Sequence, residues 1–253
     1  MAQLNLEMQK TSVKSQKSLF LARTYGWMAF ALFFSSLVAY FTSVFMWSET
    51  PDGKIILSSF GRMLFGNKGM GFMMLCVLEV VIVVFLSFRI SKMSFAAAFF
   101  SFVFYSFVNG LTLSSIFTVY NIASIANAFF STAATFLVMC LYGSKTKSDL
   151  TKAGRYLVMA LMGILLASVL HFIIGLISKS PLSMLDLIIS IATVIVFTGL
   201  TAFDSQKILR IAESAKDTED YKKIAILGAL ELYLDFINIL LSLLKIFGRS
   251  KDN

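Results

Sequence analysis

The stretch ALELYLDFINILLSLLKIF, residues 229–247, is apolar enough to cross a membrane, yet it contains Glu231, Asp235, Asn238 and Lys245. At 100° per residue, Asp235 lies about 40° from Glu231 and Asn238 about 20° on its other side, so these polar groups share one face of a helix. A carboxylate at the centre of a bilayer costs roughly 2.5–3.5 kcal/mol on insertion scales. Such charges usually face a bundle interior or a water-filled cavity, so we expect this face on an internal path. A hydrogen-bond network that only positions helices is the alternative.

The preceding apolar block offers a partner for this face. Asp204 lies near its end, in LTAFDSQKI. If the last two spans run antiparallel, Asp204 approaches the first half of the seventh span, where Asp235 lies. Two carboxylates in contact cannot both ionise cheaply, so the pair would titrate as a unit. For Asp204 alone, a solvated carboxylate at a helix end is the alternative.

Two further polar positions lie in earlier spans. Glu79 is nearly central in LCVLEVVIVVF and should be neutral or paired. Arg89 ends the same span about 15 Å later along a helix, too far to pair with Glu79 directly. It could extend to the membrane interface, or reach Asp204. Asn109 and Thr112, at helical spacing in the third span, are typical of hydrogen bonding between helices.

The elements that must position these residues are membrane helices. The 253-residue chain is 58% hydrophobic and 14% charged, whereas a soluble domain is about 45–50% apolar and about 25% charged. A helix needs about 20 residues to cross the hydrocarbon, and VLEVVIVVFLSF lacks the alternation of a barrel strand. We therefore predict an all-α integral membrane protein with seven transmembrane helices, at 24–47, 69–88, 94–119, 122–142, 156–178, 183–203 and 224–247. Its parts are a cytoplasmic tail 1–23, a transmembrane domain 24–247 and a short tail 248–253.

Charge predicts the orientation. Most lysines and arginines fall in the tail 1–23 and in alternate loops, which places the N-terminus in the cytoplasm. Seven spans then put the C-terminus outside, although the basic KIFGRSK tail prefers the cytoplasmic side. Full crossing of the last segment is expected, and a re-entrant segment is the alternative. The net charge of +8 is mostly this topology signal and needs no nucleic acid to explain it.

Classical enzymes are poorly supported by the sequence. It contains no GxSxG, phosphate-loop or HExxH pattern. His171 is the only histidine, for which a hydrogen-bonded packing role is expected, and Cys76 and Cys140 lack metal-ligand spacing. We expect no enzyme activity, no cofactor and no fixed metal site. A retinal protein is disfavoured because no lysine lies at the middle of the seventh span.

The chain resembles the Bax inhibitor-1 (transmembrane Bax inhibitor motif) family over nearly its whole length. The resemblance rests on NGLTLSSIF in the third span, TAFDSQKI closing the sixth and ALELYLDFINILLSLLKIFG in the seventh. FDSQ differs mildly from the YDTQ-like forms of the family and keeps the aspartate. The resemblance implies a seven-helix bundle with the last helix central, and it favours a bacterial inner membrane.

Members of this family are described as pH-sensitive calcium leak channels, and the resemblance implies that activity here. The aspartate pair that senses pH in the family falls on Asp204 and Asp235. An arginine that latches onto the sixth-helix aspartate is matched by Arg89 only approximately, one position from an ungapped match. The glutamate of the LEV context matches Glu79, and the resemblance implies that Glu79 lines the ion path.

The sequence therefore predicts a pH-sensitive calcium leak channel or transporter in the lipid bilayer, with calcium as the transported ion. Calcium takes several oxygen ligands, so Asp204 and Asp235 could hold it transiently, with Glu231 and Asn238 along the path. Glu231 either faces an outer vestibule or supports Asp235. The alternative function is a non-transporting regulator of a membrane protease or another membrane complex, acting through the tail 1–23.

Overall fold

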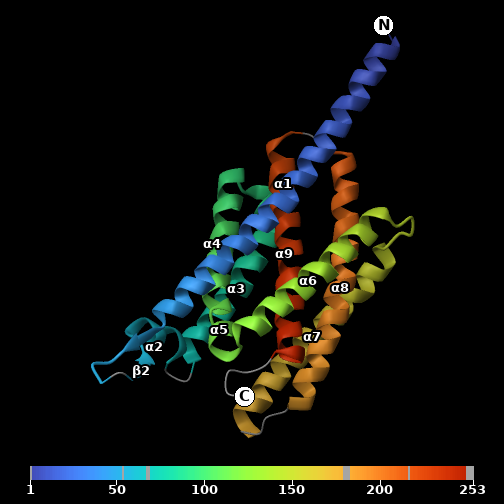
Figure 1. The fold of residues 1–253 in the computed structure, drawn as a ribbon. Coiled ribbons are helices and arrows are strands. Elements are labelled where there is room, and N and C mark those ends of the chain that lie inside the picture. Colours follow the sequence, from blue (N-terminus) through green and yellow to red (C-terminus); the bar gives the residue numbers. More distant parts are fainter. Residues whose placement is uncertain (1, 53, 67–68, 179–182, 216, 249–253) are drawn as a thin grey trace. The chain divides into compact units, whose positions relative to one another are not determined.

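The computed structural model describes residues 2–52, 54–66, 69–178, 183–215 and 217–248, and these are almost entirely helical (Figure 1). In chain order the elements are α1 (Ala2–Phe45), β1 (Trp47–Glu49), β2 (Ile55–Leu57), α2 (Ser59–Phe65), α3 (Met70–Arg89), η2 (Ile90–Lys92), α4 (Phe95–Leu113), α5 (Ile116–Val119), α6 (Ile122–Lys145), α7 (Thr151–Ser178), α8 (Ser183–Glu213) and α9 (Glu219–Phe247).

Seven helices within the described residues are long and apolar enough to cross a membrane. They are the apolar part of α1, then α3, α4 with α5, α6, α7, α8 and α9. This confirms the predicted fold class of seven transmembrane helices. The last of them, α9, has the largest buried share of the seven.

Several helices extend beyond the apolar blocks. α1 runs without a break through residue 23, α8 continues to Glu213 rather than ending near 203, and α9 begins at Glu219. Apolar length sets only the part of a helix that lies in hydrocarbon, whereas polar residues can prolong it outside. Ile208 and Ala212 are buried and keep the α8 extension packed. Acidic Glu219 and Asp220 favour the helix start of α9. The tail residues 249–253 lie outside the described residues.

The chain forms two compact units. The first takes the described residues of Met1–Val119 and Ala215–Leu230, and the second those of Tyr120–Ser214 and Glu231–Asn253. In the first unit α4 contacts both α1 and α3. The loop between α1 and α3 contains the antiparallel pair β1–β2, with Trp47 opposite Leu57, followed by α2.

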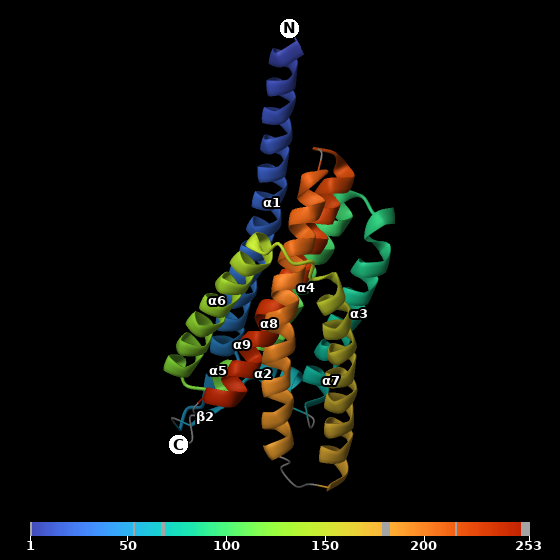
Figure 2. The ribbon, with the colours of Figure 1, turned by 90° about the vertical axis from the view of Figure 1, so that its right-hand side faces the viewer.

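The second unit holds α6, α7, α8 and the later part of α9. α8 contacts α6 and α7, and α7 and α8 lie side by side in both views (Figure 2). The later part of α9 packs through Ile239 on Val196, Phe197 and Leu200 of α8. Phe236 of α9 contacts α6 as well, with ring centroids 5.5 Å from Phe129 and 5.7 Å from Phe136. These contacts hold the α8–α9 pair in which the candidate site lies.

α6 and α8 approach closely at Gly143. A Cβ atom there would overlap the backbone carbonyl of Ala202 on α8. We expect Gly143→Ala to destabilise the protein by about 1–3 kcal/mol, since a backbone carbonyl within a helix cannot move aside. Thermal unfolding in detergent micelles measures this. Gly163→Ala is the matched control, because nothing lies within 4 Å of a Cβ at that helical position. Equal melting temperatures for the two variants would show that this contact does not limit stability.

Candidate functional site

Asp204 and Asp235 are both buried in the second unit, at 8% and 3% exposure. Asp204 lies on α8 more than two turns before the helix ends at Glu213. The solvated helix-end alternative for Asp204 is therefore wrong, because the helix continues past the apolar block and keeps the side chain enclosed. Asp235 lies within the electrostatic range of Asp204, as the antiparallel arrangement of the last two spans predicts.

An ion pair adjoins the two aspartates. Nζ of Lys207 on α8 donates to Oε1 of Glu231 on α9 over 2.6 Å. Lys207 follows Asp204 by three residues and Glu231 precedes Asp235 by four, so each partner lies about one helical turn from an aspartate. The site therefore contains three carboxylates and one ammonium group. Of the two positions left open for Glu231, the structure favours the one beside Asp235.

The hydrogen bonding of Asp235 is incomplete. Its buried Oδ2 has no hydrogen-bond partner in the structure. Thr201, one turn before Asp204 on α8, lies near the Asp235 side chain, but its hydroxyl donates to the Phe197 carbonyl over 2.8 Å. One hydroxyl proton can serve only one of these acceptors. A buried oxygen without a partner costs about 1–3 kcal/mol, so Oδ2 is a strong acceptor for a proton or a cation.

The polar face of α9 continues past Asp235. The amide nitrogen of Asn238 donates to the Leu234 carbonyl over 2.8 Å, and Ser242 is buried. The opposite, apolar face is buried too, including Tyr233 and Leu244. α9 is thus enclosed on both faces, so burial alone does not distinguish its polar side.

Glu79 belongs to the first unit and has its own partners there. Its Oε1 accepts from Asn109 Nδ2 over 3.1 Å and from Thr112 Oγ1 over 2.6 Å, both on α4. The predicted interhelical hydrogen bonding of the third span is thus present, and Glu79 is the group that it satisfies. Arg89 is exposed at the end of α3, as a side chain extending to an interface would be. Its role as a latch stays a prediction.

His171 has the polar partner expected of a packing role. Its Nε2 lies 3.1 Å from Oδ1 of Asp186, which joins α7 to α8 within the second unit. This contact lies away from Asp204 along α8, since Asp186 is in the first turn of that helix.

Comparison with known proteins decides the family. The family model described as "Inhibitor of apoptosis-promoting Bax1" matches residues 17–252. The chain belongs to the Bax inhibitor-1 family. It is 41% identical over 234 residues to inner membrane protein YbhL of Escherichia coli, covering 92% of each chain. It is 38% identical to an uncharacterized protein of Borreliella burgdorferi over the full length of both chains, and 34% identical to one of Deinococcus radiodurans over 97% of this chain and 98% of the relative.

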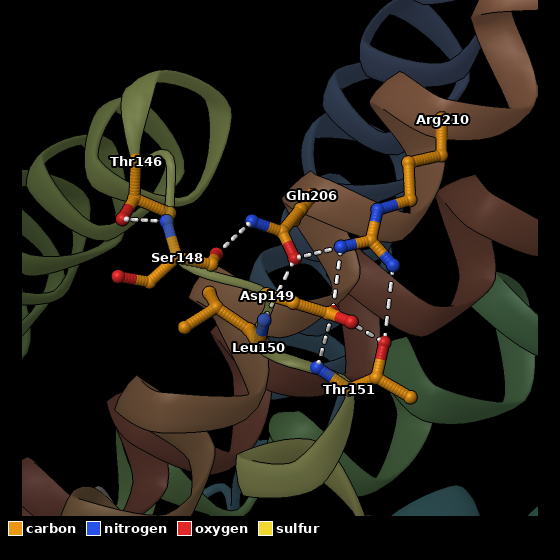
Figure 3. Close-up of polar contacts among 7 residues, drawn as sticks. All are labelled: Thr146, Ser148, Asp149, Leu150, Thr151, Gln206 and Arg210. Atoms are coloured by element: carbon orange, nitrogen blue, oxygen red, sulfur yellow. Dashed lines mark hydrogen bonds and ion pairs between the residues drawn. The ribbon is translucent and has the colours of Figure 1, made fainter.

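Together with the seven apolar helices, these relatives identify an integral protein of the bacterial inner membrane. The TAFDSQKI motif of this Bax inhibitor-1 family protein does more than supply Asp204. Gln206 clamps the loop between α6 and α7 (Figure 3): Nε2 donates to the Ser148 carbonyl over 2.8 Å, and Oε1 accepts from the Leu150 amide over 2.9 Å. Arg210 joins this network through Asp149 at 2.6 Å.

Sequence reasoning missed Gln206 and Lys207. From the sequence alone, Lys207 is assigned to a basic cytoplasmic loop, because the predicted sixth span ends at residue 203. Its spacing of three residues from Asp204 on a continuous helix was the available signal. Gln206 gave no such signal, because the loop it binds is 56 residues distant in sequence from its side chain.

Removing the Gln206 clamp should loosen the α6–α7 loop. In Gln206→Ala, the Leu150 amide loses its acceptor and the Ser148 carbonyl loses its donor. We expect the protection of the Leu150 amide to fall by about 1 kcal/mol. Hydrogen exchange measured by mass spectrometry on the detergent-solubilised protein tests this. Ser144→Ala is the matched control, since that hydroxyl bonds only within its own helix, to the Leu141 carbonyl. Unchanged exchange in Gln206→Ala would mean that the backbone alone holds the loop.

The same loop should respond to acid through Asp149. Hydrogen bonds from Thr151 and Arg210 hold the pKa of this exposed carboxyl well below its usual range. A lowered folded-state pKa means that the contribution to stability is present above the usual value of about 3.9 and is lost as the pH falls below it. We therefore expect the difference in loop protection between the wild type and Asp149→Asn to shrink progressively below about pH 4. Loop protection compared at matched pH checks this, and a difference that persists in acid would contradict it.

Proposed function

We propose that this protein is a pH-sensitive calcium leak channel or transporter, gated by protonation of Asp204 and Asp235. The observation that carries the proposal is the burial of two aspartates on two packed helices of one unit, within electrostatic range of each other. Structural carboxylates in such a setting are usually completed by donors, as Glu79 is. Asp235 is left with an oxygen that lacks a partner.

A proton shared by the two aspartates would supply that partner. It would join α8 to α9 by a hydrogen bond between carboxyl groups and leave one negative charge on the pair. Loss of the proton would leave two like charges in contact, and two unit charges about 4 Å apart repel by about 4 kcal/mol at an effective dielectric constant of about 20. That repulsion would oppose the apolar packing of α8 on α9, so flux should rise with pH.

Calcium fits the chemistry of these groups. It is a hard cation that takes oxygen ligands in flexible geometry. Carboxylate oxygens of Asp204, Asp235 and Glu231, with the Asn238 carbonyl oxygen, would provide transient ligands along α9. In the same proposal Glu79 belongs to the ion path and Arg89 is the latch, the roles that the family resemblance implies for them.

Calcium flux into proteoliposomes across a pH series tests the proposal. Wild-type flux should increase with pH, whereas Asp204→Asn and Asp235→Asn should flatten that response, so that the ratio of flux at high and low pH falls toward one. Asparagine cannot lose the proton whose release opens the gate. Asp52→Asn is the control, because it removes an exposed aspartate that lies outside the unit of the two aspartates.

An unchanged pH response in both gate variants would sink the protonation switch. If the wild type carries no calcium at any pH, the transport function itself is wrong. The regulatory alternative, with a membrane protease or another membrane complex as partner, would then be tested by deleting the tail 1–23.

A further inference from the structure

Lys207 is a cation among the charged groups of the gate. The charged side chains that act on it come from α8 and α9: Asp204, Glu231 and Asp235. Three carboxylates therefore share this ammonium group, which is bound directly to Glu231.

The register of α8 and α9 places the Lys207 ammonium about one helical turn from the two aspartates. Contacts pair Lys207 with Glu231, Thr201 with Asp235 and Phe197 with Ile239, so residue numbers fall on α8 as they rise on α9 and the helices are antiparallel. Lys207 and Glu231 therefore lie about one turn from the aspartates toward the same end of the pair. Their side chains are 40% and 27% exposed, whereas Asp204 and Asp235 are buried.

We propose that Lys207 is a tethered cation that occupies the carboxylate cluster of the gate, and that a divalent cation binds there by displacing its ammonium group from Glu231. The inference rests on the proposed function and names a regulator of that site. It assigns Lys207 the part of an internal competitor: while its ammonium pairs with Glu231, the cluster lacks the free oxygens and the net charge that a divalent ion requires.

The chemistry of the cluster supports this assignment. Calcium takes 6–8 oxygen ligands, and three carboxylates offer up to six, of which Glu231 Oε1 is bound to Lys207 and Asp235 Oδ2 has no partner. Within the described residues, no group of three His, Cys, Asp or Glu side chains is already arranged to hold a metal ion, so the carboxylates must move as the ammonium leaves. An ammonium on a four-carbon stem can move aside, because lysine makes point-charge contacts without the fixed geometry of arginine.

A merely structural ion pair would behave differently. Removing Lys207 would then cost stability and leave the affinity for cations unchanged. If Lys207 is an internal competitor, its removal should raise the affinity for cations, because it both frees Glu231 and makes the cluster more negative. The two interpretations therefore separate in a binding measurement.

Equilibrium binding of ⁴⁵Ca²⁺ to the purified full-length protein in detergent tests the inference. We expect Lys207→Met to bind about tenfold more tightly than the wild type, a typical coupling between two ligands. Lys207→Arg retains the charge and should give a smaller gain than Lys207→Met. Lys152→Met is the control for loss of a positive charge elsewhere in the same unit, since Lys152 is exposed at the start of α7.

Glu231→Gln provides a second test that does not depend on the folding of Lys207→Met. It removes one carboxylate and releases Lys207 toward the aspartates, so binding should weaken relative to the wild type. Equal ⁴⁵Ca²⁺ binding by Lys207→Met and Lys207→Arg, or by Glu231→Gln and the wild type, would overturn the inference. Because this readout involves no flux, a protein that transports no calcium but shows the binding changes refutes the proposed function alone. Conversely, pH-dependent flux with unchanged binding in the variants refutes only the role of Lys207.

Discussion

The cost of placing charge in an apolar environment governs this protein. Neither lipid nor a packed core can solvate a carboxylate, so each one must obtain a proton, hydrogen-bond donors or a cation from the protein itself. Glu79 obtains two donors from α4, and Glu231 obtains the ammonium of Lys207. Asp235 is incompletely satisfied, because its Oδ2 lacks a partner. This carboxylate is also deeply buried, so a proton or a cation would change its environment strongly.

The antiparallel register of α8 and α9 brings the charged residues of the two helices together in one site. Apolar packing of Ile239 on Phe197 and its neighbours sets how the helices are aligned. Along α9, about one turn of helix then separates Ile239 from Asp235, and another separates Asp235 from Glu231. α9 is shared by both units, since its residues up to Leu230 belong to the first and those from Glu231 to the second. A continuous helix through both means that a change at Asp235 acts on an element that the first unit also uses.

Polar residues in both units hold the ends of helices in place. Gln206, two residues after Asp204, bonds to the backbone of the α6–α7 loop. In the first unit, Glu219 at the start of α9 accepts from the Phe95 amide at the start of α4 over 2.8 Å, and Lys223 donates to the Met93 carbonyl over 3.1 Å. Backbone groups at helix ends need such partners. Side chains therefore complete the hydrogen bonding of helix ends in each unit, and Gln206 does so two residues from Asp204.

The sequence by itself determined the class, the seven spans and the family, because apolar length and recurrent motifs are local properties of the chain. Helical phase also placed Glu231, Asp235 and Asn238 on one face. The sequence did not determine where α8 ends. Hydropathy indicates only which residues lie in the hydrocarbon layer, and a helix can continue beyond that layer on polar residues. Only the tertiary structure decided that Lys207 faces Glu231, that Asn109 and Thr112 donate to Glu79, and that Gln206 binds a loop far away in sequence. Those contacts join different helices, and the register of one helix on another depends on side-chain packing that no single segment contains.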